Sequence, residues 1–173
     1  MSIGIVVGNP KPKSRTYDAA RAVLSQLTGS EPDFAIDLAD LGPKLLDWSD
    51  ADIAAAIEQV KAARLVVVAS PTYKATYTGL LKLFLDRFGA GSLTGVVAIP
   101  LQLGGDWRHS LAPEVHLKPV LNEIGASTPT RALYLLDSDA GDEPATGFVN
   151  SPTLQDWLAT ARSQLPVLPS VSA

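Results

Sequence analysis

The chain contains no cysteine, only two histidines and a single methionine among its 173 residues. The absence of cysteine excludes disulfides, thiolate metal sites, iron–sulfur clusters and a cysteine nucleophile. His109 and His116 can share a helix face, but no HExxH motif accompanies them, and only Glu123 offers a further ligand there. We therefore expect no metal site.

Positive charge is also scarce, because 14 Lys and Arg stand against 18 Asp and Glu, which gives a net charge of −4. Proteins that bind the nucleic-acid backbone usually carry a basic face, so we expect no nucleic-acid partner. No apolar run reaches the length of a membrane span, and the first residues lack the charged and apolar regions of a signal peptide. These absences predict a cytoplasmic protein without a membrane partner.

What is present is typical of a globular protein, with 46% hydrophobic and 18% charged residues. The length predicts one domain over residues 1–173, with a frayed tail at 166–173. The mean hydropathy of +0.16 is high for a small soluble monomer. It indicates apolar surface buried against another subunit.

Apolar runs and helical stripes alternate five times along the chain. The runs are apolar throughout rather than at every second position, as strands covered on both faces require. Strands are predicted at 3–7, 34–38, 64–70, 95–101 and 131–137, and helices at 17–27, 50–63, 79–88, 110–124 and 151–165. With right-handed crossovers, this pattern predicts an α/β, flavodoxin-like three-layer sandwich with a five-stranded parallel sheet in the order 2-1-3-4-5.

The remaining segments are expected to be irregular. Residues 38–48 show no clear period and are interpreted as a connector, and the acidic stretch 138–147 as a solvated loop. Pro113 and Pro119 predict that the helix at 110–124 is irregular.

In such a sheet, ligands bind at the carboxyl ends of the strands, where the strand order reverses. The first loop at this edge, GNPKPKSRT (8–16), lies between a buried strand and a helix, a position that favours an anion. It is neither a Walker A loop nor a GxGxxG motif, and a capped surface turn is the alternative interpretation. Its possible donors are Lys11, Lys13, Ser14, Arg15 and Thr16.

The two other loops at this edge suit a planar ligand. The loop 70–78 carries Tyr73 and Tyr77, although we expect Tyr77 to pack on a helix or at a subunit interface. The loop 102–107 contains a glycine pair that allows close backbone approach, followed by Trp107, which can stack on a ring or anchor a core or an interface. No GxSxG motif surrounds Ser70, so a serine hydrolase is not predicted.

The loops together resemble a known family. GNPKPKSRT resembles the GSPRxxSxT phosphate loop of the NAD(P)H-dependent FMN reductases, and SPTYKATYTGLLKLFLD (70–86) resembles their SPxYxxSxPGxLKxxLD segment. LGG (103–105) resembles their TGG turn, and residues 104–121 are similar to the following helix of the sulfonate-type branch. The resemblance spans most of residues 3–136.

This resemblance implies a flavodoxin-like fold that binds FMN at the three loops. The implied residues are Asn9, Lys11, Ser14, Arg15 and Thr16 at the phosphate, Pro71, Thr72, Tyr73 and Lys74 along the isoalloxazine ring, and Leu103, Gly104 and Gly105 at its other edge. Four positions depart from the family pattern. Asn9 replaces a serine, which is expected to alter a phosphate contact, and Thr76 replaces a serine but keeps the hydroxyl. Thr78 stands where proline is common, and Val115 stands where the sulfonate-type branch often has Tyr or His in a locally widened helix linked to flavin release.

The implied activity is that of an NAD(P)H:FMN oxidoreductase, in which hydride passes from NADPH or NADH to FMN without a catalytic side chain. Reduced flavin would then reach a partner monooxygenase. The alternatives are a quinone or azo reductase with tightly bound FMN, and a flavodoxin-type electron carrier. Members of the family form dimers and tetramers largely through the helix at 79–88, so a homodimer or homotetramer is implied.

Overall fold

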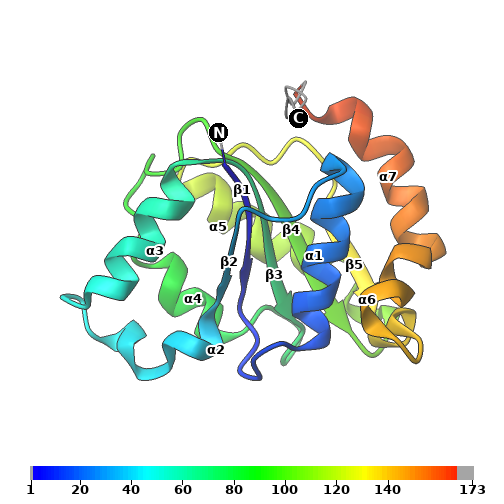
Figure 1. The fold of residues 1–173 in the computed structure, drawn as a ribbon, viewed down its shortest axis with the longest axis horizontal. Helices are drawn as coiled ribbons and strands as arrows, with labels where there is room; N and C mark the ends of the chain where they lie inside the picture. Colours follow the sequence, from blue (N-terminus) through cyan, green and yellow to red (C-terminus); the bar gives the residue numbers. More distant parts are fainter. Residues whose placement is uncertain (1, 167–173) are drawn as a thin grey trace.

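The computed structural model describes residues 2–166 and contains a five-stranded sheet with helices on both faces (Figure 1). All neighbouring strands are parallel. Their order is β2 (Phe34–Asp37), β1 (Ser2–Val7), β3 (Ala63–Pro71), β4 (Val97–Gly104) and β5 (Leu133–Leu136). The predicted flavodoxin-like fold and strand order are confirmed. Of the predicted tail at 166–173, all but Pro166 lies outside the described residues.

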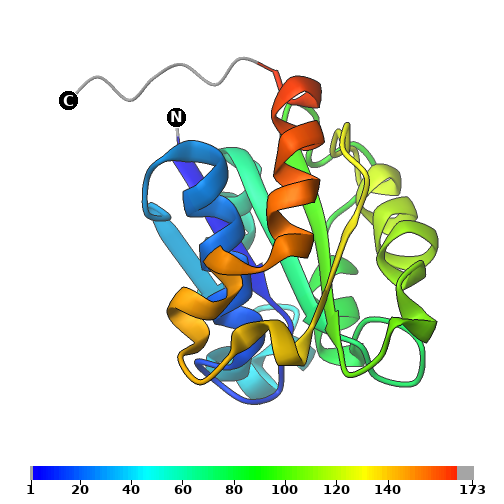
Figure 2. The same cartoon turned by 90° about the vertical axis from the view of Figure 1, so that its right-hand side faces the viewer.

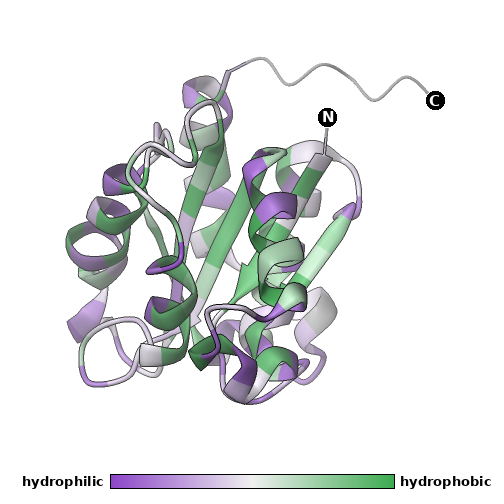
Figure 3. Cartoon of the chain, turned by 90° about the vertical axis from the view of Figure 1, so that its left-hand side faces the viewer, coloured by the Kyte–Doolittle hydropathy of each residue, from purple (hydrophilic) through white to green (hydrophobic). Residues whose placement is uncertain are grey.

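Each face of the sheet is covered by its own helices, because the continuous apolar strands present a hydrophobic surface on both sides (Figure 3). Helices α1 (Arg15–Thr28) and α7 (Pro152–Gln164) cover one face, and α3 (Ala51–Lys61), α4 (Gly79–Leu85) and α5 (Lys118–Glu123) cover the other. Ile5 and Val7 point to the first face and Val6 to the second. Burying one such side chain contributes about 1.5–3 kcal/mol.

Polar side chains fix where the longer helices begin. Ser14, Asp50 and Ser151 each accept a hydrogen bond from a backbone N–H in the first turn of α1, α3 and α7. Thr78 does the same for α4 by accepting from the Leu81 N–H. Since Ser14 and Thr78 lie in two of the predicted ligand loops, the caps also fix where those loops end.

The predicted connector and acidic loop are not irregular throughout, because both contain single helical turns, although Asp142 and Glu143 are exposed as expected. The connector contains α2 (Leu38–Leu41) and η1 (Gly42–Leu46), the acidic stretch contains η4 (Asp137–Ala140) and α6 (Pro144–Gly147), and η5 (Phe148–Asn150) follows directly after it. Leu45 and Phe148 are almost fully buried. Tertiary packing of such side chains stabilises turns that are too short to show a helical period in the sequence.

Element boundaries also differ from the prediction near the third loop. Strand β4 continues to Gly104, because residues 102 and 103 still pair with Ser70 and Pro71 of β3. The helix predicted at 110–124 is irregular, as expected, and is preceded by a short turn, η2 (Trp107–His109). It begins with a π-helical turn, η3 (Pro113–Leu117), which α5 continues.

Candidate functional site

The three predicted loops lie at the carboxyl edge of the sheet, at the lower end of the strands in Figure 1, and hydrogen bonds connect them. The Thr78 hydroxyl donates to the Gly8 carbonyl at 2.6 Å, which joins the second loop to the first. The Thr72 N–H donates to the Leu103 carbonyl at 2.6 Å, which joins the second loop to the third. The sheet edge therefore holds all three loops in a fixed arrangement.

Asn9 organises the first loop from within. Its amide nitrogen donates to the Thr16 hydroxyl oxygen at 3.0 Å, and its carbonyl oxygen accepts from the Lys11 N–H at 2.9 Å. The Ser14 hydroxyl oxygen accepts from the Tyr17 N–H at 3.4 Å. The hydroxyls of Ser14 and Thr16 thus accept within the loop and keep their protons for an outside acceptor.

The backbone adds donors to these hydroxyls. The N–H groups of Arg15 and Thr16 belong to the first turn of α1 and have no intrahelical acceptor. In the described part of the chain, the exposed side chains of Lys11 and Arg15 form no ion pair. Lys13 differs, since its ammonium lies 4.1 Å from the centre of the Tyr17 ring. The loop therefore offers hydroxyl, amide and cationic donors to an anion.

A buried carboxylate opposes this positive character. Asp37, at the end of β2, is 4% exposed and accepts from the Lys13 N–H at 2.9 Å. Burial raises the pKa of its carboxyl group, partly offset by the backbone N–H groups of Lys13 and Ala39. Asp37 thus holds the backbone of the loop in place while adding negative charge close to the proposed anion site.

Asp37→Asn tests this balance. Because the folded state raises the Asp37 pKa, the stabilisation by this group is complete below its unfolded pKa of about 3.9 and is lost as pH rises through the folded value. We expect the variant to gain stability relative to the wild type when the pH is raised, so that its free energy of unfolding minus that of the wild type is larger at pH 7 than at pH 4. Urea denaturation at the two pH values measures it, and a pH-independent difference would contradict the expectation.

The second loop contains a tight turn from Tyr73 to Thr76. The two residues exchange backbone hydrogen bonds of 2.8 and 3.2 Å, and Lys74 and Ala75 between them have φ angles of 50° and 68°. Two non-glycine residues in the left-handed region cost about 1–2 kcal/mol each, so the surrounding structure must impose this turn. Tyr73 is exposed, whereas Tyr77 packs against the core beside α4, as expected.

The predicted residues of the third loop have different roles. The Leu103 side chain is buried on the α1 side of the sheet, so only its backbone faces the loops. At Gly104, an added Cβ would lie 2.0 Å from the Tyr134 hydroxyl oxygen, so this glycine makes room for a protein side chain. At Gly105, an added Cβ would meet nothing within 4 Å. Gly105 is therefore the glycine with open space in front of it.

Tyr134 is a residue that the sequence pattern missed. It is 5% exposed, and its hydroxyl donates to the Asp106 carbonyl at 2.9 Å, which ties β5 to the glycine turn. Burial raises the pKa of this hydroxyl above its ordinary value, which is already well above neutral pH. The half-exposed Trp107 ring lies 5.9 Å from the Tyr134 ring. The sequence feature that could have indicated Tyr134 is a hydroxyl-bearing residue within an otherwise apolar predicted strand.

The arrangement fits a planar ligand that carries a phosphate. The donors of the first loop suit the phosphate, and Gly105 leaves open space at the third loop. Among residues 2–166, no group of three His, Cys, Asp or Glu side chains is placed to hold a metal ion. No helix in the same range is both long and apolar enough to cross a bilayer.

Comparison with known proteins shows the family of the chain. A family described as NADPH-dependent FMN reductase matches residues 1–141. An FMN reductase (NADPH) of Escherichia coli K12 is 32% identical over 165 residues, which cover 93% of this chain and 86% of that protein. The NADH-dependent FMN reductase SfnF of Pseudomonas fluorescens Pf0-1 is 30% identical and covers 77% of this chain and 75% of its own length.

Solved structures agree with the sequence relatives. The apo form of an NADH:FMN oxidoreductase superposes with a TM-score of 0.74 at 31% identity, covering 98% of this chain and 92% of that one. A flavodoxin, WrbA-like protein from Agrobacterium tumefaciens shares the fold, with a TM-score of 0.58 at 14% identity, and covers 95% of this chain and 100% of its own. Because the family matches residues 1–141 and the chain is about one-third identical to reductases over most of their length, the chain belongs to the NADPH-dependent FMN reductase family.

Proposed function

We propose that this protein reduces FMN with NADPH or NADH and binds FMN at the carboxyl edge of the sheet. The observation that carries the proposal is the first loop, where two hydroxyls that accept hydrogen bonds internally keep their protons beside the free N–H groups of α1. A dianionic phosphate is the natural partner of such donors. Family membership supports FMN as the molecule that carries this phosphate.

When bound, FMN supplies the redox chemistry by accepting a hydride from the nicotinamide. The chain's own contribution is to bind and orient. Lys11, Ser14 and Thr16 would hold the phosphate, while the turn at Tyr73–Thr76 and the backbone at Gly105 would contact the ring. No proton needs to be removed from the nicotinamide carbon, so no side chain acts as a general base.

We further propose that the protein works as a homo-oligomer in the cytoplasm and passes reduced flavin to a monooxygenase. The α4 surface supports the assembly, because Leu83 is 39% exposed and Leu80, one turn earlier on the same helix, is only partly buried. If sedimentation velocity shows a monomer at micromolar concentration, the proposed assembly is contradicted. Cell fractionation and FMN-dependent coupling to a purified monooxygenase test the other two parts.

Steady-state kinetics test the activity itself. We expect the purified protein to oxidise NADPH or NADH only when FMN is present, measured as loss of nicotinamide absorbance under air. If the rate saturates with added FMN, the flavin is a substrate. If the purified protein is yellow and its rate does not depend on added FMN, the flavin is a prosthetic group. No oxidation of either nucleotide with FMN present would contradict the proposal and favour an electron carrier.

A further inference from the structure

A groove lies beside the outer edge of β5, between this strand and α7. The two elements run side by side in Figure 2. Its volume is about 380 Å³, within the range of small-molecule sites. Residues of β5 and the segment before it form the floor, α7 forms one wall, and the segment Trp107–Leu111 closes one end. None of the residues proposed to contact FMN lines it.

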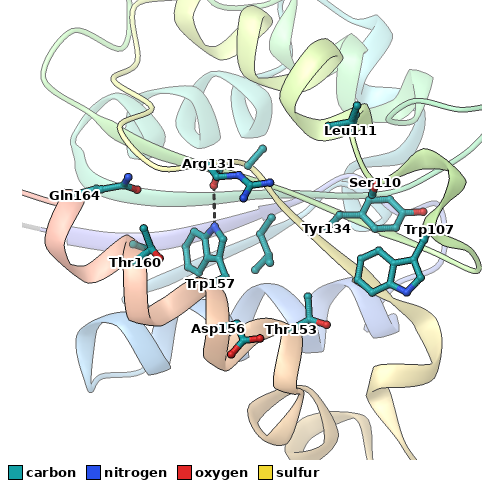
Figure 4. A pocket seen from close by; sticks show the side chains of 13 residues that line it. Trp107, Ser110, Leu111, Arg131, Tyr134, Thr153, Asp156, Trp157, Thr160 and Gln164 are labelled. Atoms are coloured by element: carbon teal, nitrogen blue, oxygen red, sulfur yellow. Dashed lines mark hydrogen bonds between the residues drawn. The ribbon is translucent and has the colours of Figure 1, made fainter.

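One end of the groove borders the proposed flavin site. Trp107 and Tyr134 lie together at this end in Figure 4, and the Tyr134 hydroxyl donates to the carbonyl of Asp106 in the glycine turn. The same hydroxyl fills the space over Gly104. A ligand stacked beside Gly105 can therefore continue past Trp107 into the groove without crossing the core.

The middle of the groove carries an aromatic face and two opposite charges. The Trp157 indole N–H donates to the Arg131 carbonyl at 2.8 Å, which fixes the ring against the edge of β5 (Figure 4). The exposed Arg131 guanidinium forms no ion pair within residues 2–166. Asp156 projects from α7 on the other side of the indole in the same view.

We infer that this groove binds the adenosine diphosphate part of NADPH or NADH while the nicotinamide lies at the flavin. The inference rests on the proposed function. Adenine can stack on an indole, a guanidinium pairs with the oxygens of the adenosine-side phosphate, and a carboxylate accepts from ribose hydroxyls. An uncharged aromatic electron acceptor would use the indoles but would make no use of the charges of Arg131 and Asp156.

The first test compares hydride donors that carry adenosine monophosphate with one that lacks it. With FMN saturating, Arg131→Gln is expected to raise the KM for NADPH or NADH about 5- to 20-fold, since a charged hydrogen bond to phosphate is lost at an exposed site. The KM for reduced nicotinamide mononucleotide, which lacks adenosine monophosphate, should not change. The matched control is Arg162→Gln, an arginine of α7 whose guanidinium donates to the Gln26 carbonyl away from the groove.

The second test needs neither flavin nor turnover. Titration calorimetry should detect ADP-ribose binding to the wild type and to Arg162→Gln, with affinity reduced about 5- to 20-fold in Arg131→Gln. Absence of ADP-ribose binding by the wild type, or equal affinity in both variants, overturns the inference. So does a higher KM of Arg131→Gln for FMN alone, which would assign the groove to flavin. Continued oxidation of reduced nicotinamide mononucleotide in every variant would leave the proposed reductase activity standing.

Discussion

Replacing Ser14 and Thr16 together by alanine is expected to weaken FMN binding by about a hundredfold or more and to leave riboflavin binding nearly unchanged. Each hydroxyl keeps a proton for the phosphate, and a hydrogen bond to a charged group contributes about 1.5–3 kcal/mol. Riboflavin has the same ring and ribityl chain but no phosphate. The measurement is fluorescence titration of both flavins against wild type and variant.

The double variant also removes the N-cap of α1, so a loss of fold has to be separated from a loss of contacts. Ser151→Ala is the matched control, because Ser151 caps α7 in the same way, with its hydroxyl oxygen 3.4 Å from the Leu154 N–H. Both changes should lower the free energy of unfolding by about 1 kcal/mol per cap. Equal weakening of FMN and riboflavin binding would refute the phosphate assignment.

Alanine at the two neighbouring glycines of the third loop is expected to impair different properties, stability at Gly104 and FMN binding at Gly105. Gly104→Ala should lower the free energy of unfolding by about 2–4 kcal/mol, since the new Cβ would lie 2.0 Å from the Tyr134 hydroxyl oxygen. Gly105→Ala should change stability by less than about 0.5 kcal/mol but weaken FMN binding about tenfold, because its Cβ enters open space that we assign to the ring. Urea denaturation and flavin titration measure the two effects.

A double-mutant cycle identifies the clash at Gly104. Tyr134→Phe removes the hydroxyl oxygen, so Gly104→Ala should cost less in that background than in the wild type. An equal cost in both backgrounds would mean that Tyr134 is not the obstacle. For Gly105→Ala, unchanged FMN affinity would remove this glycine from the flavin site.

The sequence alone predicted the sheet, its strand order and the three loops, because continuous apolar strands and capped helices leave local signals. It could not predict which groups of a loop face outward. Leu103 was expected at the flavin, yet its side chain is buried because β4 continues beyond residue 101. Strand ends depend on pairing with β3, which is a tertiary property.

Residues that position the loops were missed for a similar reason. Asp37 and Tyr134 act on the loops from strands that are 24 and 28 residues away in sequence from their partners Lys13 and Asp106. No local periodicity encodes such contacts. Asn9 was expected to alter a phosphate contact, and the structure shows it bonded to Thr16 and Lys11 within the loop. A motif gives the residue type at a position, but it does not give the group to which that side chain bonds.

The hydroxyl of Thr78 belongs to two elements at once, since it caps α4 and donates to the Gly8 carbonyl of the first loop. A single atom thus takes part in the ordering of the loop and in the position of the helix. If subunits associate through α4, ligand affinity and subunit affinity become thermodynamically linked, and the coupling free energy is the same in both directions. The apparent affinity for flavin would then depend on the protein concentration, and the association of subunits would depend on the flavin concentration.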